Sequence, residues 1–225
     1  MTVMNFALQP DGVFVIADTL VTNAEFGPAF FTSKIHPVPH LNGLICGTGN
    51  LGLILDWSRH VLGGMLALDV SHLDEFVPDS LRALHSARPE REREEMTSTI
   101  YHLGFDDQRD RFVGFAYRST AHFASERLDY GMRIKPGVRA AVPIAEFPDD
   151  FVALCRAQRI EQDALPPEER VFIGGHVTAY MMQAERVDGR PTAVRTTITR
   201  CFEFEDFERA YFECTAGLAA NSGLT

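Results

Sequence analysis

Two short apolar runs near the start of the chain, Val3–Leu8 and Val13–Ala17, flank the turn sequence Pro10-Asp11-Gly12. An Asp-Gly pair between two apolar runs is a strong short-range signal for a β-hairpin, because glycine accepts the positive φ that a tight turn requires. The second run ends in Asp18, which places a carboxylate at the end of a strand. We therefore expect the chain to begin as a sheet around which the later elements are arranged.

Two further apolar runs follow, one starting at Lys34-Ile35 and one at Leu44–Cys46 that ends in Gly47-Thr48-Gly49. We expect both runs to add strands to the same sheet. Thr2, Asp18, Lys34 and the glycine turn would then lie at or near strand ends, so the sheet would gather polar groups at its edge.

Thr2 is notable because initiator methionine is usually removed when the next residue is small. Loss of Met1 would make Thr2 the amino-terminal residue, with a hydroxyl nucleophile and its own α-amine as base. An α-amine has a pKa of about 7.7–8, which suits a base at neutral pH. A nearby Lys34 would lower that pKa further, and Asp18 would hold Lys34. Each residue also has an ordinary role open to it: a plain penultimate Thr, a turn Asp and a surface Lys.

The spacing of Thr2, Asp18, Lys34 and Gly47 resembles the amino-terminal half of proteasome β-type subunits and their bacterial relatives. The likeness covers residues 2–65. It implies that Thr2 is the nucleophile, that Asp18 and Lys34 support it, and that the backbone N–H of Gly47 stabilises the oxyanion. It also implies a homo-oligomer, such as a ring, with the site facing an inner chamber.

In the remainder of the chain, the spacing of apolar residues changes several times between the period of a helix and that of a strand. A single helix over residues 73–87 is interrupted by Pro78, so two shorter helices are equally compatible with the pattern. The other expected elements are helices at Asn50–Leu62, Asp149–Asp163 and Glu205–Ala216, and strands at Thr97–Gly104, Arg111–Tyr117, Val177–Ala184 and Val194–Thr199. The last two strands flank an Asp188-Gly189 turn and are expected to form a second hairpin. The glycine turn should place the start of the first helix beside Thr2, and Phe207, Tyr211 and Phe212 of the last helix are expected to pack inward.

This order of strands and helices suits two sheets packed face to face with helices outside. We therefore expect an α+β fold, namely the four-layer αββα sandwich of Ntn hydrolases, with two mainly antiparallel sheets between helices. No repeat or linker divides the chain, so residues 1–225 are expected to form one proteasome-like domain.

Composition excludes several classes of partner. The 225 residues are 45% hydrophobic and 23% charged, and the formal net charge of −10 argues against nucleic acids and anionic membranes. No apolar run approaches the roughly 18 residues of a membrane span, and no signal sequence is visible at the start. We expect a cytoplasmic protein.

Metal and cofactor sites are not indicated. The four cysteines, at positions 46, 155, 201 and 214, are far apart, and the eight histidines are scattered without ligand spacing. The sequence Gly47-Thr48-Gly49-Asn50 lacks the Lys-Ser/Thr ending of a phosphate-binding loop. We expect no metal and no cofactor.

The sequence departs from the family at supporting positions. No serine occurs in the middle segment Ile134-Lys135-Pro136-Gly137, while Arg170 and Ile173 stand where the family carries Asp and Ser, and Leu20 where it carries Arg. Two hypotheses follow. The first is an N-terminal threonine amide hydrolase that cleaves a peptide or a small amide. The second is a catalytically inactive proteasome-like subunit with a structural or binding role.

Overall fold

The first five-stranded sheet is antiparallel and contains the predicted amino-terminal hairpin. The computed structural model describes residues 2–23 and 27–222. In this sheet the strand order is β10-β1-β2-β11-β12. Its strands are β1 (Met4–Gln9), β2 (Gly12–Asp18), β10 (Gly131–Lys135), β11 (His176–Val187) and β12 (Arg190–Glu203). The predicted hairpins β1–β2 and β11–β12 are both confirmed.

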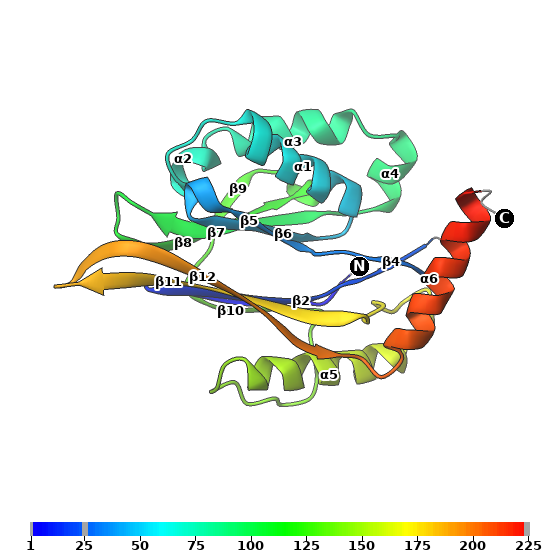
Figure 1. Cartoon of the computed structure of the whole chain (residues 1–225). Helices are drawn as coiled ribbons and strands as arrows, with labels where there is room; N and C mark the ends of the chain where they lie inside the picture. Colours follow the sequence, from blue (N-terminus) through cyan, green and yellow to red (C-terminus); the bar gives the residue numbers. More distant parts are fainter. Residues whose placement is uncertain (1, 24–26, 223–225) are drawn as a thin grey trace.

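The second five-stranded sheet faces the first and has the order β5-β6-β7-β8-β9 (Figure 1). Its strands are β5 (Ile35–Val38), β6 (Gly43–Thr48), β7 (Thr99–Asp106), β8 (Arg111–Arg118) and β9 (Ser125–Arg127). The prediction that the first four apolar runs share one sheet is wrong, because the runs are divided between the two facing sheets.

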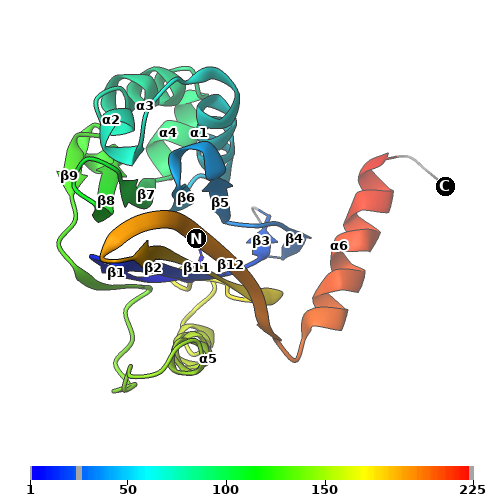
Figure 2. The same cartoon turned by 60° about the vertical axis from the view of Figure 1, so that its left-hand side comes forward.

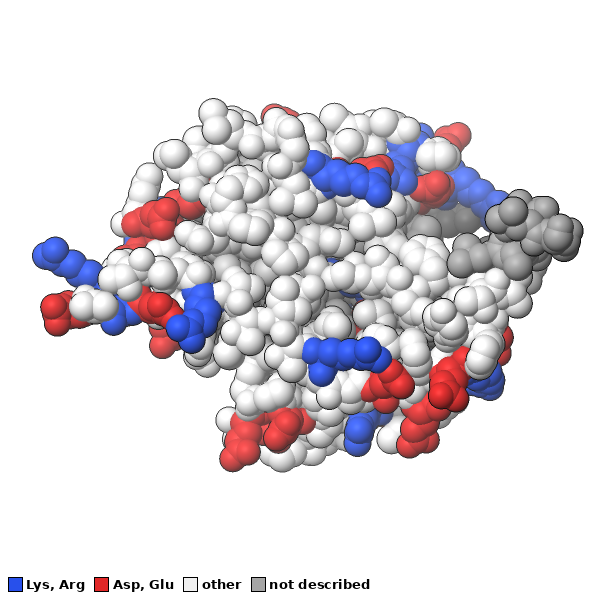
Figure 3. All heavy atoms as spheres, in the orientation of Figure 1, with Lys and Arg blue, Asp and Glu red and all other residues white. Residues whose placement is uncertain are grey.

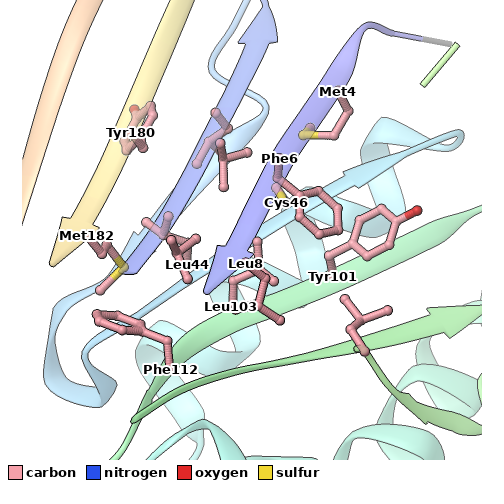
Figure 4. Close-up of a cluster of buried hydrophobic side chains, with 14 of the residues drawn as sticks. Met4, Phe6, Leu8, Leu44, Cys46, Tyr101, Leu103, Phe112, Tyr180 and Met182 are labelled. Atoms are coloured by element: carbon pink, nitrogen blue, oxygen red, sulfur yellow. The ribbon is translucent and has the colours of Figure 1, made fainter. Parts of the chain in front are cut away.

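Apolar side chains from both sheets fill the space between them. Figure 4 shows Leu8 of β1 near Leu44 of β6 and Leu103 of β7, with Phe6 and Met4 further along β1 in the same cluster. All five side chains are at most 1% exposed. Since side chains alternate along a strand, each sheet also presents apolar residues on its outer face, where the helices pack.

Helices lie on the outer sides of both sheets (Figures 1 and 2). On the side of the second sheet are α1 (Leu51–Gly64), α2 (Val70–Asp74), α3 (Val77–Ser86) and α4 (Glu90–Glu95), and on the side of the first sheet is α5 (Asp149–Asp163). Pro78 lies in the first turn of α3, so the segment forms two short helices. Within the described residues, no helix combines the length and the apolar character needed to cross a membrane.

The expected fold class, a four-layer αββα sandwich of two mainly antiparallel sheets between helices, is wrong for this chain. The described residues form three sheets with twelve strands, and the third sheet is the hairpin of β3 (Leu20–Thr22) and β4 (Pro28–Phe31). The last helix, α6 (Phe207–Ser222), lies beside β4 and away from both five-stranded sheets (Figure 2).

The side chains of α6 also differ from expectation. Tyr211 and Phe212, which were expected to pack inward, are 50% and 69% exposed. An apolar periodicity identifies a helix face, but it does not specify which surface covers that face.

A buried histidine makes the stability of the fold dependent on pH. Trp57 Nε1 of α1 donates a 2.7 Å hydrogen bond to His102 Nε2 of β7, and both side chains are fully buried. His102 Nδ1 has no hydrogen-bond partner within the described part of the chain. Burial lowers the pKa of His102 to about 3, so the ring stays neutral in the folded protein.

We predict that acid destabilises the protein through His102. A folded pKa below the unfolded one gives stability that is present above about pH 6.5 and is lost as pH falls towards 3. Between pH 8 and pH 5 this group alone should lower the free energy of unfolding by about 2 kcal/mol. Urea denaturation at both pH values measures the change. The amide oxygen of Gln in His102→Gln can still accept from Trp57. In this variant the decrease in the free energy of unfolding between pH 8 and pH 5 should be smaller than in wild type by about 2 kcal/mol. An equal decrease in the free energy of unfolding in wild type and in His102→Gln would contradict the assignment of this pH dependence to His102.

Candidate active site

The three polar residues singled out in the sequence meet at one end of the two facing sheets. Thr2 precedes β1, Asp18 ends β2, and Lys34 stands directly before β5 of the opposite sheet. Their side chains are 6%, 0% and 6% exposed, respectively. The hairpin thus brings Thr2 and Asp18 together on one sheet, and Lys34 reaches them from the other.

Lys34 is the centre of the hydrogen-bond network. Its Nζ lies 2.6 Å from Thr2 Oγ1, 2.8 Å from Asp18 Oδ1 and 2.6 Å from the carbonyl oxygen of Leu20. A protonated lysine has three N–H donors, so all three are used here. The arrangement fixes the ammonium against the Thr2 hydroxyl.

Asp18 is held by donors on several sides. Besides Lys34, its Oδ1 accepts from the Thr2 hydroxyl and, at 3.2 Å, from the backbone N–H of Val3. Its Oδ2 accepts from the backbone N–H of Gly174 at 3.1 Å. Gly174 is brought there by the pairing of β2 with β11, in which Asp18 lies opposite Val177. The buried negative charge is therefore compensated by hydrogen bonds as well as by Lys34.

The electrostatics of the site make the Lys34 ammonium more acidic than that of an exposed lysine. Burial lowers the pKa of Lys34 below its usual range, and the attraction of Asp18 and its hydrogen bond oppose that shift. An ammonium with a lowered pKa transfers a proton more readily than an exposed one. Lysine suits this place because a guanidinium stays charged under all ordinary conditions.

Gly47 lies on β6, opposite Ile100 of β7, and its backbone lines a cavity together with Thr2 and Lys34. A Cβ at this position would lie 2.7 Å from the carbonyl oxygen of Thr99. The position therefore requires glycine in this packing. That the Gly47 N–H stabilises an oxyanion stays a prediction.

The cavity has a volume of about 400 Å³. The first residue of α1 reaches it, which agrees with the expectation that this helix begins beside Thr2. Its wall is largely apolar, with Glu168 and Arg170 as further charged residues; the apolar side chains are Leu20, Val21, Leu51, Ile54, Met96 and Phe172. Such a space accommodates a small or extended amide against an apolar surface.

Several partners in the site were missed by sequence reasoning. The carbonyl of Leu20 and the N–H groups of Val3 and Gly174 are backbone groups, and no residue type signals their role. Arg170 was noted only as a departure from the family, although it lines the cavity beside Thr2. Ile173, another of the departures, is 3% exposed and buried in apolar surroundings.

The second lysine of the chain also spans the two sheets. Lys135, at the end of β10, lies opposite Met4 of β1, and its Nζ is 3.4 Å from the hydroxyls of Thr48 and Thr99. Thr48 lines the same cavity as Thr2. Both lysines therefore reach across the gap between the sheets at the end that carries the site.

Other kinds of site find little support. Among the described residues, no group of three or more His, Cys, Asp or Glu side chains is placed to hold a metal ion, and the four cysteines are free. On the face shown in Figure 3, Lys and Arg lie mostly beside Asp and Glu, without a continuous basic patch.

Comparison with known proteins does not assign the chain to a family. No model of a known protein family matches it, and no curated protein matches it in sequence.

Proposed function

We propose that the chain is an N-terminal threonine amide hydrolase, similar to proteasome β-type subunits and acting on a peptide or a small amide. One observation carries the proposal: a buried lysine contacts both the hydroxyl of Thr2 and the carboxylate of Asp18 at the edge of a cavity. A structural threonine and a surface lysine would not need this arrangement.

The proposed reaction begins with removal of Met1, which lies outside the described residues. Thr2 Oγ1 attacks the carbonyl carbon of the amide while its proton passes to the freed α-amine. Lys34 stabilises the developing negative charge on Oγ1, and the N–H of Gly47 stabilises the oxyanion. The C–N bond then breaks, and the leaving amine takes up the proton. Water hydrolyses the ester on Thr2, releasing the acid and restoring the hydroxyl, so the cycle needs no cofactor.

The proposal includes a homo-oligomer in the cytoplasm. Four free thiols suit a reducing compartment. The helix α6 lies away from the two five-stranded sheets, and its Tyr211 and Phe212 are exposed. A second copy of the chain would cover these side chains. The single-domain organisation of residues 1–225 belongs to the same proposal.

Hydrolysis of a panel of fluorogenic peptide and small-amide substrates tests the function. We expect Thr2→Ala to lower kcat/KM by about 1,000-fold or more, because it removes the attacking oxygen, and Thr2→Ser to retain measurable activity. Thr22→Ala is the matched control, since Thr22 lines the same cavity; it should stay within a few-fold of wild type. Thr2→Ala with the wild-type rate would refute the proposal.

The alternative is an inactive proteasome-like subunit with a structural or binding role. The observation that favours it is the apolar Ile173 and basic Arg170 at positions where the family carries Ser and Asp. Against it, backbone groups of Val3, Leu20 and Gly174 supply hydrogen bonds to Asp18 and Lys34. An intact oligomer without Thr2-dependent hydrolysis of any amide in the panel would favour this alternative.

A further inference from the structure

We propose that the cavity beside Thr2 accepts a substrate that carries a carboxylate, and that Arg170 is the residue that recognises it. The inference deepens the proposed function and rests on it, because it names the substrate class of the same site. It starts from the observation that Arg170 lines the cavity together with the nucleophile and Lys34.

The guanidinium of Arg170 is held in place by an aromatic ring. Its Cζ lies 4.3 Å from the centre of the Phe172 ring, and Phe172 lines the same cavity. Stacking on an aromatic face orients the planar group and leaves its edge available for hydrogen bonds. The side chain is 26% exposed. It is thus partly desolvated but still accessible from the cavity.

The donors of Arg170 are poorly used within the protein. Its ion pair with Asp163 spans 3.7 Å between Nη1 and Oδ1, which is too long for a hydrogen bond. The other carboxylate oxygen of Asp163 accepts from Arg159 Nε at 3.1 Å. Arg170 Nε is buried and has no hydrogen-bond partner among the described residues. Since Nε is enclosed by the protein, a ligand with two acceptor oxygens would bind the terminal N–H groups, whose contact with Asp163 is too long for a hydrogen bond.

Other charges at the cavity do not account for the same recognition. Lys34 donates to three protein oxygens, and Asp18 is fully engaged by Lys34 and backbone N–H groups. Of the described residues that line the cavity, Glu168 adds an exposed carboxylate, which would repel an anionic ligand. Among the described residues of the cavity wall, Arg170 is therefore the cation left to bind a carboxylate, and Glu168 should weaken that binding.

Isothermal titration with the Thr2→Ala protein tests the inference without relying on turnover. The probes are N-acetylglutamate methylamide and its neutral isostere N-acetylglutamine methylamide. A charge-assisted, bidentate contact should make the acidic probe bind about 10- to 100-fold more tightly. Adding Arg170→Gln should remove this difference, and adding Arg170→Glu should reverse it.

Two further variants keep the test independent of damage to the fold. Glu168→Gln leaves Arg170 intact and should raise the affinity for the acidic probe by about two- to five-fold. Arg156→Gln is the matched control: Arg156 stacks on Phe202 at 4.8 Å but lines a different pocket. Arg156→Gln should change the affinity for neither the acidic nor the neutral probe.

Parallel assays with wild-type protein and fluorogenic amides of Glu and Gln separate the two proposals. Thr2-dependent hydrolysis with equal rates for both amides, or a preference for the acid that survives Arg170→Gln, would overturn the carboxylate inference alone. Arg170-dependent binding without Thr2-dependent hydrolysis would overturn the hydrolase and leave the carboxylate site standing. Equal binding of the two probes by the Thr2→Ala protein would also overturn the inference.

Discussion

Lys34→Met lowers the free energy of unfolding by about 3–5 kcal/mol in our account, because it leaves a buried carboxylate without its counter-ion. Asp18 is fully buried, and Lys34 Nζ lies 2.8 Å from its Oδ1. Methionine fills a similar volume, so the loss reports the charge rather than a cavity. The same change should lower kcat/KM by about 100-fold or more, since the Thr2 hydroxyl loses the group that stabilises its negative charge. Guanidinium denaturation at pH 7 and the amide assay measure both effects.

Two controls identify the cause of this loss. Asp18→Asn in the Lys34→Met background removes the second charge and should recover part of the stability without recovering activity. Arg59→Met breaks an ion pair with Asp56 whose partners are 76% and 46% exposed, and it should cost less than about 1 kcal/mol. If Lys34→Met destabilises the protein no more than Arg59→Met, the buried pair does not have the role assigned to it.

Gly49→Ala should be the second severe substitution. Gly49 has φ +102°, and a Cβ there would clash with the carbonyl oxygen of Thr97. Relief requires the backbone around Thr97 to move away from the turn that leads into α1. Backbone strain and overpacking together should lower the free energy of unfolding by about 3 kcal/mol or more. Displacement of Leu51, which lines the cavity, should also weaken hydrolysis.

Gly63→Ala is the matched control for Gly49→Ala. Gly63 lies in α1, and apart from the adjacent backbone of the helix a Cβ there would meet no atom of the described residues within 4 Å. Alanine should stabilise the helix by up to about 1 kcal/mol. Denaturation curves of both variants measure these changes in the free energy of unfolding. A Gly49→Ala protein as stable as wild type would show that the turn adopts another conformation.

The site was predictable because its residues are fixed by short-range signals. The Asp-Gly turn sets the register of β1 and β2, so that Met4 pairs with Ala17 and the ends of the hairpin meet. Asp18 follows Ala17 directly, and Thr2 lies two residues before Met4, so both stand just beyond that pair. Lys34 precedes an apolar run in the sequence, and the start of β5 was placed within one residue.

The remainder of the site depends on long-range pairing that the sequence does not reveal. The first four apolar runs are divided between the two five-stranded sheets, and this places Lys34 on the sheet opposite Asp18 rather than beside it. The pairing of β11 with β2 brings the N–H of Gly174 to Asp18, across more than a hundred residues of sequence. The hairpin of β3 and β4 falls in a segment for which the sequence analysis predicted no element. Apolar periodicity identifies a strand or a helix, but not its partner.

Intact mass spectrometry of the protein expressed from its native start tests the central claim most directly. The mass is measured before and after treatment with a threonine-directed β-lactone. We predict loss of Met1 and a single covalent adduct that is absent in Thr2→Ala. Retention of Met1 with no adduct would contradict it, because Thr2 would then have neither a free amine nor a reactive hydroxyl.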